Sequence, residues 1–154
     1  MPKLQAGDVA PGLALSDEDG SVITLGDYQG KRVVVYFYPA DDTPGCTKEA
    51  CQFSDLFDEF LAAGVDVIGI SPDDESSHRR FREKFGLTVR LLSDPSHSVM
   101  ESYGAWGEKT LYGKRSVGVI RTTVLVGAEG RIERAWYHVR ADGHAAKVLA
   151  AVTA

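Results

Sequence analysis

The two cysteines of the chain, Cys46 and Cys51, are the residues best suited to carry chemistry, and they are five positions apart. Residues 33–38 form an apolar run that predicts a buried strand, and the apolar spacing that follows Pro44 predicts a helix. Cys46 then lies in the first turn of that helix. Unpaired backbone N–H groups and the positive end of the helix dipole favour a thiolate at this place. The sequence therefore predicts that Cys46 is nucleophilic.

Composition limits what else the protein does. With 154 residues, 44% of them hydrophobic and 25% charged, the chain is long enough for one globular domain spanning residues 1–154. A formal net charge of −5 argues against a polyanion-binding surface, so we expect no nucleic acid partner. The sequence has no signal peptide pattern and no apolar stretch of membrane-spanning length, which favours a cytoplasmic location and no membrane contact.

In a reducing cytosol, two close cysteines are typical of redox activity or metal binding rather than of a permanent bridge. The four histidines are scattered without ligand spacing, so we expect no metal site. They are His78, His97, His138 and His144. Redox chemistry is therefore the stronger interpretation of the cysteine pair.

The elements expected around Cys46 alternate between strand and helix. Two short strands at residues 13–15 and 22–25 predict an N-terminal hairpin or a pair of edge strands. Further strands are predicted at residues 33–38, 65–70, 90–93, 121–126 and 132–137, with the last two in an antiparallel hairpin. Helices are predicted at residues 44–63, about 75–85, 96–103 and 143–152. This order predicts an α/β fold with a mixed sheet and helices on both faces.

The spacing Pro-x-x-x-Thr-x-x-Cys, formed by Pro39, Thr43 and Cys46 after a buried strand, resembles the active-site signature of the peroxiredoxins. Cys51, five residues further on, resembles the second cysteine of the bacterioferritin comigratory protein branch, also called peroxiredoxin Q. Further segments resemble that branch in order and spacing: residues 6–11, 65–71, 91–94, 103–109 and 121–126. The resemblance covers nearly the whole chain and implies a thioredoxin-like fold and a monomer.

The same resemblance implies a thiol-specific peroxidase for hydrogen peroxide and organic hydroperoxides, acting in antioxidant defence. Cys46 would attack the peroxide and become a sulfenic acid, and Cys51 would resolve it as an intramolecular disulfide. Thioredoxin or a similar dithiol protein would return the electrons. The chemistry needs no cofactor.

Three further catalytic roles follow from the resemblance. Thr43 would place its hydroxyl on the thiolate and the peroxide, and Pro39 would shield the site from water. Arg121 would stabilise both the thiolate and the charge that develops on the peroxide oxygens. The candidate residues of the substrate pocket are Pro44, Gly45 and Trp106. For Trp106, packing in the core under a loop is an equally open alternative.

The spacing of the cysteines also predicts a conformational change. On an ideal helix, residues five apart have Cα atoms on the order of 8 to 9 Å from each other. A disulfide tolerates about 7 Å at most. If Cys46 and Cys51 are both helical in the reduced protein, the start of the helix must unwind before they can bond.

Asp41 and Asp42 oppose the simple interpretation, because carboxylates close to a thiol disfavour its ionisation. Lys48 is the nearby cation that could offset them.

Two other functions remain open for the cysteine pair. A protein thiol–disulfide oxidoreductase is one, although such enzymes typically use Cys-x-x-Cys, which is absent here. A non-catalytic peroxide sensor that signals through a disulfide between Cys46 and Cys51 is the other. Turnover of peroxide at substoichiometric protein distinguishes an enzyme from a sensor.

Overall fold

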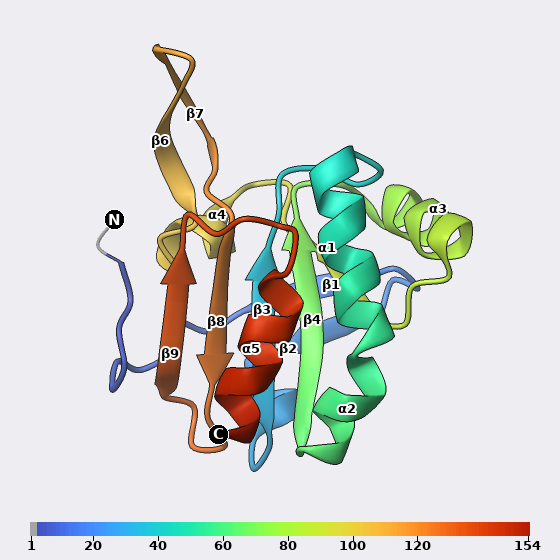
Figure 1. Ribbon diagram of the computed structural model, residues 1–154, viewed down its shortest axis with the longest axis vertical. Coiled ribbons are helices and arrows are strands. Elements are labelled where there is room, and N and C mark those ends of the chain that lie inside the picture. The colour runs from blue at the N-terminus through green and yellow to red at the C-terminus, as the bar shows by residue number, and fades with distance from the viewer. Residues whose placement is uncertain (1–2) are drawn as a thin grey trace.

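The computed structural model describes residues 3–154, apart from the side chain of Leu111. Seven strands of this part of the chain form one sheet in the order β2-β1-β5-β4-β3-β8-β9 (Figure 1). Their bounds are β1 Ala14–Asp17, β2 Val22–Thr24, β3 Arg32–Phe37, β4 Val65–Ser71, β5 Arg90–Ser93, β8 Thr122–Val126 and β9 Ile132–Tyr137. Strands β3, β4 and β5 are parallel, and β8, β9, β1 and β2 add to them in antiparallel pairs. The predicted mixed sheet and N-terminal hairpin are confirmed.

Helices cover both faces of this sheet, as predicted. Their bounds are η1 Leu25–Tyr28 (a 3-10 helix), α1 Pro44–Asp55, α2 Phe57–Ala62, α3 Glu75–Phe85, α4 Ser98–Ser102 and α5 His144–Thr153. One face of β3 packs against apolar side chains from α1, α2, α3 and α5, and the other against side chains of η1 and α4. Successive side chains of β3 point to opposite faces, so this strand supplies both core clusters. Among the helices formed by residues 3–154, none has both the length and the apolar character needed to cross a membrane.

The prediction of one continuous helix over residues 44–63 is wrong, because the helix breaks at Leu56. Thr88 accounts for the break. Its backbone N–H donates to Ser54 Oγ (3.1 Å) and its hydroxyl donates to the Ser54 carbonyl (3.3 Å), which takes that carbonyl away from the helical ladder. Phe53 and Phe60, on either side of the break, still pack together with ring centroids 5.9 Å apart. The change of direction therefore costs the core little contact.

A two-stranded hairpin, β6 (Trp106–Leu111) with β7 (Lys114–Val119), was not predicted and projects from the body of the molecule (Figure 1). Most residues of β7 are exposed, so this strand lacks the alternation of buried and exposed residues by which a strand can be predicted from a sequence. Its turn is formed by Tyr112 and Gly113, both with positive φ (53° and 76°). Two such residues are typical of a type I′ hairpin turn.

The sheet register brings the segments that carry the predicted site to one edge. Phe37, the last residue of β3, pairs with Thr122, the first residue of β8. The segment that leaves β3 toward α1 and the residue that precedes β8 therefore lie next to each other. These are the loop before Cys46 and the residue Arg121.

Candidate active site

Cys46 and Arg121, 75 positions apart in the sequence, are in direct contact. Nη2 of Arg121 donates a hydrogen bond to Cys46 Sγ at 3.2 Å, and the cysteine is only 2% exposed. Gly45 lies against the same guanidinium, because a Cβ added to this glycine would be 3.4 Å from Nη2. The positive charge of Arg121 favours a negative charge on the sulfur, and the bond to an ionised sulfur would be charge-assisted. The structure thus joins the predicted nucleophile to the predicted cation.

Glu49 is a site residue that the sequence reasoning missed. Its Oε1 accepts a hydrogen bond of 2.6 Å from Nη1 of Arg121, and its side chain is fully buried. Burial raises the pKa of Glu49 to about 7, against the opposing charge and hydrogen bond of Arg121. The signal was present in the sequence, since Glu49 is three residues after Cys46 on the face of α1 that also buries Ala50 and Phe53. Arg121 therefore bridges the thiol and a buried carboxylate, which fixes its orientation.

Thr43 and Pro39 lie in the segment between β3 and α1. Thr43 is the N-cap residue of α1, and its carbonyl accepts from the Thr47 N–H at 2.8 Å. Its hydroxyl donates to the Ala40 carbonyl at 2.9 Å, a bond that closes the turn before the helix. Pro39 is half-buried in the bend that follows β3, and Pro44 is the exposed first residue of α1. The structure places all three beside Cys46 in the chain, and their roles toward a peroxide stay predictions.

Trp106 lies elsewhere. Its ring stacks on His97 with centroids 3.7 Å apart and packs against the core cluster that includes α4. Cys46 belongs to the cluster on the opposite face of the sheet. This placement favours the core-packing alternative for Trp106 over a place in the peroxide pocket.

Cys51 has different surroundings from Cys46. Both thiols are free, and both lie within the uninterrupted helix α1. Cys51 is half-buried, and burial together with the negative charge of Asp55 raises the pKa of its thiol. The helical state of both cysteines is the condition under which the spacing argument requires unwinding.

The carboxylates that were expected to oppose the thiolate are both paired. Asp41 Oδ2 lies 2.7 Å from His78 Nδ1, and Asp42 Oδ2 lies 2.8 Å from Lys84 Nζ. Lys48, the cation expected to offset them, instead faces Asp142 at 3.9 Å on the surface. Both carboxylates before α1 are therefore paired with side chains of α3, namely His78 and Lys84.

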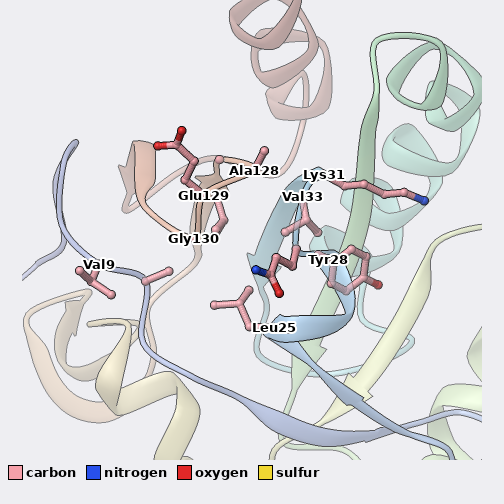
Figure 2. Close-up of a pocket in the computed structure, with 13 residues that line it drawn as sticks. Val9, Leu25, Tyr28, Lys31, Val33, Ala128, Glu129 and Gly130 are labelled. Atoms are coloured by element: carbon pink, nitrogen blue, oxygen red, sulfur yellow. The ribbon is translucent and has the colours of Figure 1, made fainter.

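The structure also has a cavity of about 300 Å³, and Figure 2 shows the residues that line it. It is lined by Val33 at the start of β3 and Val126 at the end of β8, with Leu25 and Tyr28 of η1 beside them. Cys46 comes after the opposite end of β3, and Arg121 comes directly before the opposite end of β8. None of the site residues described above lines the cavity, so it is not part of the thiol site.

Comparison with known proteins agrees with this geometry. Residues 6–135 match the AhpC/TSA family. The chain belongs to this family. A putative peroxiredoxin of Mycobacterium tuberculosis is 51% identical over 146 residues, which cover 95% of this chain and 93% of the relative. Peroxiredoxin Bcp of Escherichia coli is 47% identical over 149 residues, which cover 97% of this chain and 96% of the relative.

Solved structures of peroxiredoxins are similar to the whole fold. A structure of Xanthomonas campestris peroxiredoxin Q has a TM-score of 0.87 and 40% identity, and the match covers 92% of this chain and 89% of that chain. A structure of the bacterioferritin comigratory protein of the same organism, solved in a study of its alkyl peroxide reduction activity, has a TM-score of 0.86 and 40% identity, covering 92% and 90%. The thioredoxin-like fold, the peroxiredoxin Q branch and the peroxidase class of enzyme predicted by resemblance are confirmed.

Proposed function

We propose that this peroxiredoxin reduces hydrogen peroxide and organic hydroperoxides with Cys46 as the nucleophile. The thiolate attacks one peroxide oxygen and the O–O bond breaks, so that the sulfur is oxidised to a sulfenic acid. The other oxygen leaves as hydroxide or alkoxide and takes up a proton to become water or an alcohol. The observation that carries this proposal is the 3.2 Å contact between Arg121 Nη2 and the buried Cys46 Sγ.

Arg121 acts both before the attack on the peroxide and in the transition state. Its guanidinium faces the sulfur before the attack and, in the transition state, stabilises the charge that grows on the peroxide oxygens. Glu49 holds the guanidinium in place through the 2.6 Å bond to Nη1. Gly45 is exposed and lies beside Arg121, and Pro44 before it is exposed too, so the first turn of α1 is the side from which a small peroxide reaches the thiol. Thr43 supplies a hydroxyl at the helix N-cap, and Pro39 shields the site from water.

Cys51 resolves the oxidised enzyme. Its thiol attacks the sulfenic sulfur, water leaves, and a disulfide forms. Because the two cysteines are five residues apart on one continuous helix, with a Cα separation on the order of 8 to 9 Å for ideal geometry, the first turns of α1 must unwind. Gly45 in the first turn of the helix lowers the cost of this step, because glycine gains more conformational freedom than other residues on unwinding.

A dithiol protein such as thioredoxin then reduces the disulfide in a reducing compartment such as the cytosol. Both thiols belong to one helix of one chain, so a monomer can complete the cycle. The alkyl peroxide reduction ascribed to the Xanthomonas campestris relative supports organic hydroperoxides as substrates.

The test is peroxide consumption by substoichiometric protein with thioredoxin as the electron donor. We expect many equivalents of hydrogen peroxide or cumene hydroperoxide to be consumed per chain, and Cys46→Ser to reduce consumption to the background of the buffer. Consumption that stops after one equivalent would support the sensor instead. Full turnover by Cys46→Ser would remove Cys46 from its proposed role, and insulin disulfide reduction without peroxide would favour a protein thiol–disulfide oxidoreductase.

A further inference from the structure

His78, on α3, is a fully buried histidine whose two ring nitrogens both face acceptors. Nδ1 lies 2.7 Å from Asp41 Oδ2, and Nε2 lies 2.9 Å from the Leu92 carbonyl of β5. A carbonyl and an ionised carboxylate can only accept hydrogen bonds, and a neutral imidazole has only one N–H. Beside an ionised Asp41, only the protonated ring satisfies both contacts, so the geometry fits a buried imidazolium paired with a carboxylate.

The partner carboxylate is held by more than the histidine. Asp41 Oδ1 accepts from the Tyr38 hydroxyl at 2.6 Å, and Oδ2 accepts from the Ser77 hydroxyl at 2.7 Å. These two donors and His78 together contact both oxygens of the Asp41 carboxyl group. The Asp41 backbone N–H also donates to Asp73 Oδ2 at 2.8 Å. Asp41 is thus fixed from three sides: the end of β3, helix α3 and the connection between β4 and α3.

Asp41 belongs to the turn that leads into the reactive helix. The next residue, Asp42, has a φ of 56°, a left-handed conformation that is uncommon for non-glycine residues but that Asp adopts more readily than most in turns. Thr43 then closes the turn through its hydroxyl bond to the Ala40 carbonyl and occupies the N-cap position of α1. The position of Cys46 at the start of α1 follows from this turn.

We propose that His78 is a positioning residue for peroxide reduction, which through Asp41 holds the turn before α1 in the shape that places Cys46 against Arg121. This inference rests on the proposed function, because it assigns His78 a part in the reaction of Cys46. His78 touches neither the sulfur nor a substrate. It acts through Asp41 alone.

The protonation of His78 makes this role depend on pH. Burial lowers the pKa of His78, but the hydrogen bond and charge of Asp41, the Leu92 carbonyl and the charge of Asp73 raise it more, so that it lies above the ordinary 6.5. Tyr38, the other titratable group against the ring, has a pKa raised well above 10 by burial and by Asp41, and it stays neutral. A raised histidine pKa means that the ion pair is complete below pH 6.5 and is lost as pH rises through the raised value.

Loss of that proton leaves one ring nitrogen facing an acceptor without a hydrogen. Either the bond to Asp41 or the bond to Leu92 then fails, and the turn loosens at Asp41. A displacement of about 1 Å at a reacting group can lower a rate on the order of 100-fold. We therefore expect peroxide reduction to fall at alkaline pH.

The experiment compares His78→Asn with His78→Leu in the full chain, with His138→Asn on the exposed segment after β9 as the matched control. The Asn side chain can still donate to Asp41 but cannot titrate, whereas Leu leaves Asp41 without this partner. The readouts are kcat/KM for hydrogen peroxide between about pH 5 and pH 10, where a histidine titrates, and the unfolding midpoint of each variant.

The proposal predicts three results. Wild type and His138→Asn lose activity as pH rises above the raised pKa of His78, and His78→Asn keeps its activity over that range. His78→Leu loses on the order of 10- to 100-fold in kcat/KM at neutral pH. An unchanged alkaline fall in His78→Asn, or a wild type without any fall, would overturn the proposal.

A second readout covers two cases: a His78→Leu variant that does not fold, and a wild type that does not turn over peroxide. It is the rate of Cys46 alkylation by iodoacetamide in a Cys51→Ser background, measured across the same pH range for wild type and His78→Asn. A ratio of the two rates that changes as His78 titrates supports the positioning role, and a constant ratio contradicts it. If the wild type does not turn over peroxide, the proposed function fails. The positioning role of His78 is still tested in that case, because alkylation of Cys46 needs no peroxide.

Discussion

The two thiols of helix α1 differ in what surrounds them more than in where they lie. Cys46 is buried under the guanidinium of Arg121, which Glu49 holds from the other side. Cys51 is half-exposed, and burial and Asp55 raise the pKa of its thiol. One sulfur contacts a guanidinium, and the pKa of the other is raised by its surroundings in the intact helix.

This contrast explains how one helix can hold a nucleophile and its resolving partner without premature reaction. A protonated thiol attacks slowly, so Cys51 is a poor nucleophile in the folded helix. Unwinding of α1 takes Cys51 away from the surroundings that raise its pKa and, in the same step, brings it within bonding distance of Cys46. The predictions below test the two halves of this contrast, beginning with the largest expected effect.

Cys51→Ser should abolish turnover with thioredoxin while leaving the first oxidation of Cys46 at the wild-type rate, because Cys51 takes no part in the attack on peroxide. Stopped-flow measurement of the first oxidation, together with steady-state peroxide consumption, separates the two. Sulfenic acid on Cys46 should accumulate and be trapped by dimedone. A slowed first oxidation would show that the two thiols are not independent.

Arg121→Ala should lower the rate of Cys46 oxidation on the order of 10²- to 10³-fold, the cost of losing one preorganised donor to a developing charge. Arg121→Lys should recover only part of this rate, since an ammonium cannot contact Glu49 and Cys46 in the same forked way. Arg115→Ala, on the exposed strand β7, is the control. Equal rates for the Arg121 and Arg115 variants would contradict the role of the guanidinium.

Glu49→Gln should change how stability depends on pH. The pKa of Glu49 is raised from 4.5 to about 7, so the folded state binds this proton more tightly than the unfolded state does. Its contribution to stability is complete below pH 4.5 and is lost as pH rises to about 7, by roughly 3 kcal/mol.

Urea unfolding at several pH values measures that loss. The Glu49→Gln variant should lack this part of the wild-type decline in stability, and Glu108→Gln, at an exposed position of strand β6, should keep it. Parallel curves for wild type and Glu49→Gln would show that Glu49 does not titrate in this range.

Gln52→Ala should loosen the part of α1 that holds Cys51. The Gln52 side chain donates to Asp142 Oδ1 and accepts from the Gly143 N–H, both at 2.8 Å, and so ties α1 to the start of α5. Loss of these bonds costs about 1 kcal/mol, or roughly fivefold in a local opening equilibrium. Amide exchange of residues 48–55 should accelerate by about that factor. Gln5→Ala, at an exposed position far from α1, should leave it unchanged.

The sequence supports the prediction of the fold best where burial leaves a periodic pattern. The apolar runs of β3 and β4 predict those strands correctly, and the helical spacing of the apolar residues from Phe53 to Leu61 predicts helical structure there, which the protein forms as α1 and α2. The hairpin β6–β7 was not predicted, because its residues are mostly exposed and show no alternation. The break at Leu56 was also not predicted, because it depends on contacts from Thr88, more than 30 residues away.

Some residues of the site could likewise be predicted from the sequence, and others could not. Cys46 and Arg121 could be proposed together only through a family resemblance, and the register of β3 with β8 supplies the physical reason for their contact. Glu49 was missed because a charged residue on a helix is expected to face water. The pairing of Asp41 with His78 depends on how α3 packs, which local sequence does not indicate.

Amide hydrogen exchange over residues 44–55, compared between the reduced protein and the protein oxidised by one equivalent of hydrogen peroxide, tests the central claim most directly. If Cys46 and Cys51 form a disulfide that the intact helix cannot accommodate, protection of these amides should be lost on oxidation, while β3 and β4 keep theirs. Mass spectrometry on the same sample should show the bond between Cys46 and Cys51. A confirmed disulfide with unchanged protection across α1 would contradict the account.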